Sequence, residues 1–121
     1  MATCNESSSI RRKLALIIGN GNYSRPQNRL THPVMNANDL CDSLKKINFN
    51  VTTVIDLVKQ EMLKRITEFS KAISDGDLIL FYFSGHGYHV NGENYMIPID
   101  DDNIKADCDF EDFAVNFQRT L

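Results

Sequence analysis

The sequence predicts an α/β fold, a mostly parallel sheet with helices on both faces, and two observations lead to this prediction. Strand-like and helix-like patterns alternate over residues 13–83, which is typical of right-handed crossover units that place helices over a parallel sheet. Residues 14–18 and 78–83 are unbroken apolar runs, too short for helices and typical of strands buried on both faces. With 121 residues, 42% of them apolar, the chain has the composition of one globular domain.

Five elements make up this alternation. After the first strand, apolar residues recur at helical spacing from near Thr31 or His32, with Pro33 in the first turn, which favours a helix. A segment of alternating apolar and polar residues predicts a second strand, and the amphipathic helix after it ends before Gly76. In chain order the predicted elements are strand 13–18, helix 31–47, strand 49–55, helix 58–73 and strand 78–83.

The two ends of the chain follow different patterns. Residues 1–11 are mostly polar and lack periodicity, so we expect a disordered N-terminal segment. A doubly wound domain should continue from its last helix into a further strand, so we expect the domain to be C-terminally incomplete. The other predicted features are a hairpin turn at Asn91-Gly92, an extended segment at 95–99, a solvated acidic loop at 100–109 and a helix at 110–121.

Composition excludes several classes of function. The formal net charge is −3 and no basic cluster exceeds Arg11-Arg12-Lys13, which argues against nucleic-acid binding. The chain has no apolar stretch near the ~18 residues of a membrane helix and no signal-peptide pattern, so we expect a cytoplasmic protein without membrane contact. Cys4, Cys41 and Cys108 lack the spacing of zinc ligands and are expected to be reduced thiols, with no metal site.

The segment Ser84-Gly85-His86-Gly87 follows the last predicted strand and places a histidine between two glycines. Chemistry in open parallel sheets gathers beyond the carboxyl ends of the strands, so His86 lies where a catalytic base is expected. From position alone, a structural histidine in a tight turn is as good an interpretation. Gly19-Asn20-Gly21 after the first strand is an incomplete dinucleotide-binding fingerprint, because its third glycine would fall at Ser24.

Residues 12–121 resemble the N-terminal, histidine-bearing half of a caspase-like cysteine peptidase domain, and within that clan they are closest to paracaspases. The resemblance implies a three-layer caspase-like fold, truncated before the strand that carries the nucleophile, and a large-subunit catalytic domain. Its motifs are Leu14 to Asn20 with Tyr23, the helix from Pro33 to Leu44, Phe81 to Gly87, and Asn94 to Asp100.

The same resemblance implies cysteine endopeptidase activity without a metal or organic cofactor. His86 matches the catalytic histidine, and Gly87 matches the residue whose backbone N–H helps to bind the oxyanion. The nucleophilic cysteine would lie beyond Leu121. Cys108 is a poor substitute, because Asp107 and Asp109 disfavour its thiolate form.

Four further residues are candidates for substrate binding. Asn36 matches the position at which paracaspases and metacaspases carry an acidic residue for a basic substrate side chain, and Asp39 lies close to the same helix face. Arg29 lies near the position of an arginine that serves acidic substrates in caspases, and His89 is a loop residue near the site. The alternative for each is a solvated polar residue without a role in binding.

The expected partner is a protein or peptide substrate. The alternative is a non-catalytic caspase-like module that binds or regulates an active relative, or forms a homodimer. Such pairing would use an uncovered sheet edge and an apolar face formed by Phe110, Phe113 and Phe117.

Overall fold

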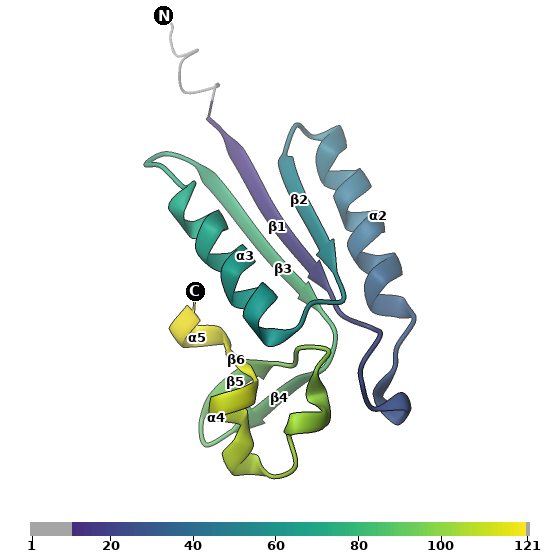
Figure 1. The fold of residues 1–121 in the computed structure, drawn as a ribbon. Helices are drawn as coiled ribbons and strands as arrows, with labels where there is room; N and C mark the ends of the chain where they lie inside the picture. Colours follow the sequence, from purple (N-terminus) through teal and green to yellow (C-terminus); the bar gives the residue numbers. More distant parts are fainter. Residues whose placement is uncertain (1–10, 121) are drawn as a thin grey trace, which may run out of the picture.

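The computed structural model describes residues 11–120, and it contains a three-stranded parallel sheet with a smaller antiparallel sheet beyond one end of it (Figure 1). The disorder predicted for residues 1–11 therefore falls outside the described residues, apart from Arg11. The first part of the chain comprises β1 (Lys13–Gly19), a 3-10 turn (Pro26–Asn28), α2 (His32–Lys46), β2 (Asn50–Ile55), α3 (Lys59–Lys71) and β3 (Leu78–Ser84). The second comprises β4 (Gly87–Val90), β5 (Glu93–Met96), 3-10 turns at Asp101–Asn103 and Asp107–Asp109, α4 (Phe110–Phe113), β6 (Val115–Asn116) and α5 (Phe117–Thr120).

The parallel sheet has the strand order β2-β1-β3, so β1 is the central strand. Successive side chains of a strand point to opposite faces, and in β1 they enter two different clusters. Leu16 and Ile18 pack with the α3 residues Met62 and Ile66. Ala15 and Ile17 pack with α2, through Ala37, Cys41 and Leu44. Helices therefore cover both faces, which confirms the predicted three-layer α/β architecture.

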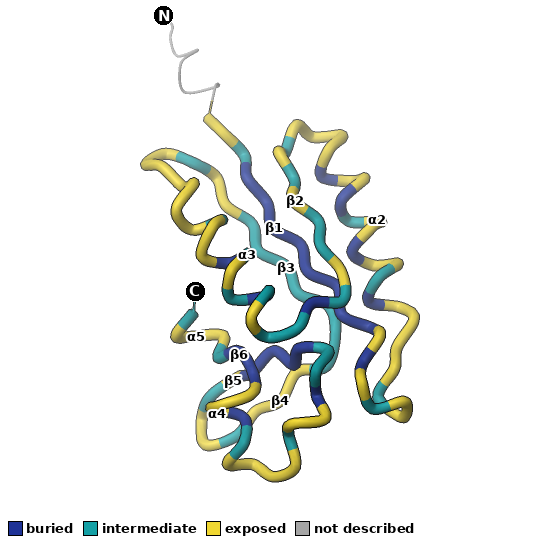
Figure 2. The backbone as a smooth tube through the Cα atoms, in the orientation of Figure 1, coloured by how far each residue is buried: buried dark blue, intermediate teal, exposed yellow. Residues whose placement is uncertain are grey.

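The prediction that β3 is buried on both faces is wrong. Leu78 is 41% exposed and Ile79 is 37% exposed, and the rest of the strand is half-buried. β3 pairs with β1 on one side only, and no strand among residues 11–120 pairs with its other edge. An apolar run indicates a strand with apolar neighbours but not its place in the sheet, and here β1 takes the central position. Figure 2 shows this contrast between the two strands.

The small antiparallel sheet has the order β4-β5-β6 and follows β3 directly. Asn91 and Gly92 have φ angles of 52° and 77°, as a two-residue type I′ turn requires, which confirms the predicted hairpin turn. The sequence did not predict a strand at residues 87–90. A third apolar cluster, which includes Tyr23, Tyr95 and Phe110, packs beside this sheet.

The continuous helix predicted for residues 110–121 is wrong. α4 ends at Phe113, and Val115 pairs with Met96 as part of β6 before α5 begins at Phe117. Val115 is buried in the cluster that also contains Met62 and Ile66 of α3, and its pairing with Met96 interrupts the helix. Phe110 is buried whereas Phe113 and Phe117 are exposed, so the three do not form one apolar face.

The acidic loop also differs from its prediction at one position. Asp101 is only 3% exposed, although most of its neighbours in the loop are solvated as expected. None of the helices in residues 11–120 has the length and apolar character needed to cross a membrane.

Candidate active site

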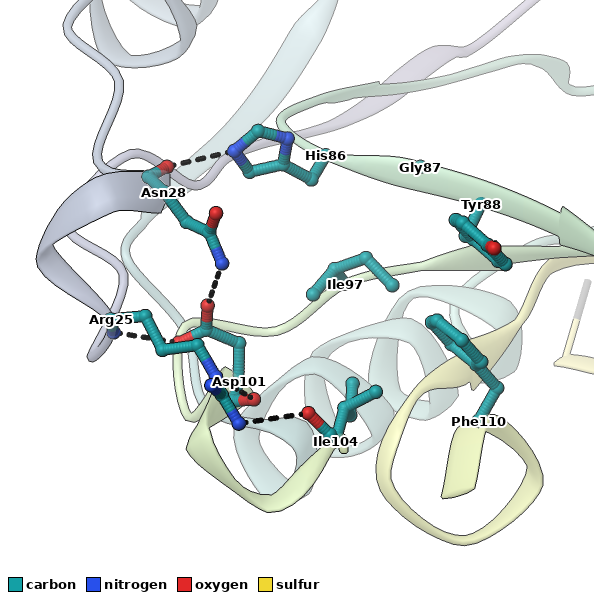
Figure 3. A pocket seen from close by; sticks show the side chains of 9 residues that line it. All are labelled: Arg25, Asn28, His86, Gly87, Tyr88, Ile97, Asp101, Ile104 and Phe110. Carbon is teal, nitrogen blue, oxygen red and sulfur yellow. Dashed lines mark hydrogen bonds between the residues drawn. The ribbon is translucent and has the colours of Figure 1, made fainter. Parts of the chain in front are cut away.

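His86 lies between β3 and β4, at the carboxyl end of the parallel sheet where the two sheets meet (Figure 1). It borders a pocket of about 180 Å³ (Figure 3). Side chains from the loop after β1, the β4–β5 hairpin and the segment after β5 converge on this pocket. The lining residues are Arg25, Asn28, His86, Gly87, Tyr88, Ile97, Asp101, Ile104 and Phe110.

The imidazole of His86 has a defined hydrogen-bond partner. Its Nε2 lies 2.7 Å from the backbone oxygen of Asn28. A carbonyl oxygen only accepts hydrogen bonds, so Nε2 carries a proton. In the neutral ring Nδ1 is then the nitrogen that can accept a proton, which is the property needed of a general base.

The backbone of His86 is held by Tyr23. The His86 N–H donates to the Tyr23 hydroxyl at 2.9 Å, and that hydroxyl donates to the Ile97 carbonyl at 3.0 Å. The rings of Tyr23 and His86 also pack together, with centroids 4.8 Å apart. Burial raises the pKa of Tyr23 to about 12, so its phenol stays neutral and keeps its proton for the bond to Ile97.

Asn20 is a fully buried polar residue beneath this arrangement. Its Nδ2 donates to the Ile97 carbonyl at 3.2 Å, and its Oδ1 accepts from the Leu57 N–H at 3.0 Å. Its own backbone N–H donates to the carbonyl of Ser84 at the end of β3. Asn20 therefore connects the ends of β1 and β3 to the segment that leaves β5.

Asp101 organises the loop on the other side of the pocket. Its carboxylate accepts from the Arg25 N–H at 3.0 Å and from Asn28 Nδ2 at 2.7 Å. The Arg25 guanidinium donates to the backbone oxygens of Asp101 and Ile104 (Figure 3). It also donates to the backbone oxygen of Asp102. The charged groups of this wall thus have partners within the chain, and the carbonyl that binds His86 belongs to the loop that they hold.

The two glycines beside His86 meet different constraints. A Cβ on Gly85 would lie 2.7 Å from the Tyr23 hydroxyl and 2.8 Å from the Phe83 ring, so only glycine fits there. A Cβ on Gly87 would approach the Tyr95 carbonyl oxygen at 3.6 Å, which is ordinary contact. Nothing within residues 11–120 therefore requires glycine at position 87.

The hairpin register indicates where the Gly87 N–H points. Val90 and Glu93 flank the two-residue turn and form its closing hydrogen-bonded pair. Such pairs alternate with non-hydrogen-bonded pairs in an antiparallel ladder. Counted from the turn, Gly87 and Met96 form the fourth pair, which is therefore a non-hydrogen-bonded pair. The N–H of Gly87 therefore faces away from β5, next to His86.

The structure does not bring the four predicted substrate-binding residues into the pocket. The Nε of Arg29 donates to the Tyr23 backbone oxygen at 2.9 Å. Asn36 and Asp39 are exposed on α2. His89 is exposed on β4 and forms a 2.8 Å hydrogen bond with Asn94 across the hairpin. Their roles in binding stay predictions.

The cysteines are placed apart from His86. Cys41 is buried against the α2 face of the sheet, and Cys108 is exposed and does not line the pocket. Cys4 lies outside the described residues. No group of three His, Cys, Asp or Glu side chains in the described part of the chain could hold a metal ion.

Sequence reasoning missed three residues that build this site: Tyr23, Asn28 and Asp101. Tyr23 offered a partial signal, since it is a lone aromatic residue in a polar loop directly after a buried strand. Asn28 acts through its backbone oxygen, which no side-chain pattern reveals. Asp101 was indistinguishable from its neighbours Asp100 and Asp102 in an acidic run.

Comparison with known proteins places this geometry in context. Residues 12–117 match a protein family described as the caspase domain. The chain is similar to the human mucosa-associated lymphoid tissue lymphoma translocation protein 1, with 36% identity over 91 residues, 75% of this chain and 11% of that protein. The mouse homolog of that protein is 34% identical over 91 residues, again 75% of this chain and 11% of the relative. The chain thus spans about a tenth of the length of these relatives.

Proposed function

This chain belongs to the caspase domain family, and from that premise we propose that it carries the catalytic histidine of a cysteine endopeptidase of the caspase and paracaspase type. The observation that supports the proposal most is the imidazole of His86, with Nε2 bonded to the Asn28 oxygen at the edge of a pocket. This one hydrogen bond orients the ring and places the proton on Nε2, so Nδ1 is the nitrogen that can accept the proton of a thiol.

The proposed reaction is hydrolysis of a peptide bond through an acyl-enzyme. Nδ1 of His86 takes the thiol proton of a cysteine as sulfur attacks the scissile carbonyl, and the imidazolium then gives a proton to the departing amine. The carbonyl oxygen becomes an oxyanion in the tetrahedral intermediate, and the outward N–H of Gly87 donates to it. Water then attacks the thioester, which releases the acid product and restores the thiol.

The nucleophile in this proposal comes from a segment outside residues 1–121. Cys41 is buried in the core, and Cys108 lies in an exposed 3-10 turn that does not line the pocket. The length of the curated relatives, of which this chain covers 11%, leaves room for such a segment.

Substrate preference in this proposal differs from that of basic-specific relatives. Asn36 accepts a hydrogen bond but supplies no negative charge, so it favours a basic substrate side chain less than a carboxylate does. Asp39 lies one turn further along α2 and is exposed. Arg29 has exposed surface but uses its Nε for the Tyr23 backbone oxygen.

The experiment is to read the transcript past the codon for Leu121, express the chain with that continuation and assay it against a fluorogenic peptide library. We expect cleavage that falls at least about 100-fold in His86→Ala. The control is His32→Ala, an exposed histidine on α2. Full activity in His86→Ala, or cleavage by residues 1–121 alone that survives Cys108→Ala, would contradict the proposal.

A non-catalytic pairing module is the second candidate function, and the exposed edge of β3 favours it. Leu78 and Ile79 present apolar side chains there, and a second caspase-like chain could extend the sheet by pairing with this strand. Light scattering of the chain, alone and mixed with an active relative, tests this candidate. A complex that Leu78→Lys disrupts supports it, and a chain that stays monomeric in both samples contradicts it.

A further inference from the structure

We propose that Tyr23 is the positioning residue for His86, and that its hydroxyl and ring together hold the imidazole at the edge of the pocket. The proposal rests on the proposed function for its catalytic meaning, but its structural content concerns only residues 11–120. It assigns a role to a side chain that lies 63 positions away from His86 in the sequence.

The first argument comes from the hairpin register. His86 and Ile97 follow the non-hydrogen-bonded pair of Gly87 and Met96, so they should form the next hydrogen-bonded pair and exchange both backbone bonds. Only one of these bonds is direct, from the Ile97 N–H to the His86 oxygen at 3.0 Å. The other is replaced by the Tyr23 hydroxyl, which accepts from the His86 N–H and donates to the Ile97 oxygen.

This insertion opens the hairpin ladder at His86. A hydroxyl between two backbone groups separates them by more than one hydrogen-bond length, so the ladder opens on the side of the His86 N–H. His86 is therefore held at the end of the hairpin without being a regular ladder residue, and β4 begins only at Gly87. Gly85 permits this arrangement, because any side chain there would meet the hydroxyl at 2.7 Å.

The second argument comes from the ring and the loop. The Tyr23 ring packs against the imidazole at a tilt of 58°, which restricts the rotation of the His86 side chain. The backbone oxygen of Tyr23 accepts from Arg29 Nε at 2.9 Å. Arg29 directly follows Asn28, whose oxygen binds Nε2 of His86. Tyr23 thus contacts both the backbone and the ring of His86. It also contacts the loop that carries Asn28, the hydrogen-bond partner of the imidazole.

A purely structural role for Tyr23 is the competing explanation, since its side chain is fully buried in an apolar cluster. Tyr23→Phe separates the two roles, because it keeps the ring and removes only the hydroxyl. In that variant the Ile97 oxygen keeps the donor Asn20 Nδ2, and the His86 N–H alone loses its partner. We therefore expect the loss of the hydroxyl to affect His86 more than any other residue.

The experiment is NMR on the chain labelled with ¹⁵N-histidine, comparing the unmodified protein with Tyr23→Phe and with the control Tyr82→Phe. Tyr82 is a β3 residue that packs against the α2 cluster and does not line the pocket. In Tyr23→Phe we expect a smaller fraction of the Nε2–H tautomer and at least about tenfold faster exchange of that proton with water. Tyr82→Phe should match the unmodified chain.

Unchanged tautomer and exchange in a folded Tyr23→Phe variant would overturn the proposal. If that variant does not fold, the unmodified chain provides the test. The phenolic proton of Tyr23 is buried next to the His86 amide, so the two protons should give an NMR cross-peak. Absence of this cross-peak would equally overturn the proposal. In the enzyme with its continuation, the variant should lower kcat more than it raises KM. NMR changes at His86 in a protein that cleaves no peptide would support Tyr23 as a positioning residue while contradicting the proposed function.

Discussion

The backbone oxygen of Asn28 accepts a 2.7 Å hydrogen bond from Nε2 of His86, a residue 58 positions later in the chain. This single contact determines which imidazole nitrogen carries the proton and which one is left to accept another. The oxygen is held in place by its loop, and the loop is held by Asp101. The chemistry available to His86 therefore depends on a carboxylate that never touches the imidazole.

Asp101→Ala should loosen the Asn28 loop. The change removes the charged acceptor of the Arg25 N–H and of Asn28 Nδ2, both partly buried donors, and a hydrogen bond to a charged group contributes about 1.5–3 kcal/mol. We expect the free energy of unfolding, measured by urea denaturation, to fall by about this amount. The Nε2–H signal of His86 should also broaden or disappear in NMR spectra. Asp102→Ala, at an exposed neighbour, is the control and should change neither measurement.

Alanine should destabilise the protein at Gly85 but not at Gly87, the two glycines that flank His86. Gly85→Ala forces a Cβ to within 2.7 Å of the Tyr23 hydroxyl, and overpacking of this kind costs about 1–3 kcal/mol. Gly87→Ala meets its nearest atom at 3.6 Å, so its free energy of unfolding should stay within about 0.5 kcal/mol. Thermal unfolding of both variants measures the difference. Equal destabilisation, or a larger effect at Gly87, would contradict the close contact between position 85 and the Tyr23 hydroxyl.

The fold was predictable to the extent that it is encoded locally. The apolar run of β1 and the 3.6-residue pattern of α2 each lie within one segment, and both elements form where the sequence predicts them. Strand order is not local, so the exposed edge of β3 could not be distinguished from the buried centre of the sheet. The helical spacing of Phe110 and Phe117 was misleading, because pairing of Val115 with β5 interrupts the helix between them.

The site was predictable only where a short motif carries it. His86 and Gly87 stand in the turn after a strand, and that position is visible in the sequence. Tyr23, Asn28 and Asp101 reach the site through contacts between residues 58 to 76 positions apart. Contacts at such separations depend on how the loop after β1 and the segment after β5 come together, which no periodicity in either segment indicates.

Asn20→Ala should destabilise the fold without adding any steric conflict. The variant leaves the buried N–H of Leu57 without its acceptor, whereas the Ile97 oxygen keeps the Tyr23 hydroxyl as a donor. One unsatisfied buried donor predicts a loss of about 1–3 kcal/mol in the free energy of unfolding. Asn22→Ala, at an exposed asparagine in the same loop, is the control for urea denaturation. A loss no greater than that of the control would mean that the Leu57 N–H finds another partner.

The ion pair between Arg12 and Asp77 should make stability depend on acid pH. Arg12 Nε and Nη2 donate to the Asp77 carboxylate at 3.0 Å and 2.5 Å. The hydrogen bond from Arg12, followed by the one from the Ser74 N–H, holds the pKa of Asp77 below its usual value. Because the folded-state pKa is the lower one, this carboxylate contributes stability above its unfolded pKa of about 3.9. That contribution is lost as the pH falls through the folded-state value.

Asp77→Asn isolates this contribution, because the amide keeps the shape of the side chain and removes its titration. We expect the variant to have a lower urea midpoint than the unmodified chain near neutral pH, and the gap between the two to narrow as the pH falls below about 4. Asp75→Asn, at an exposed position two residues earlier, controls for a general effect of removing one negative charge. A gap that is constant across the acid range, or one that widens at low pH, would show that the carboxylate is not the group whose ionisation links Arg12 to β3.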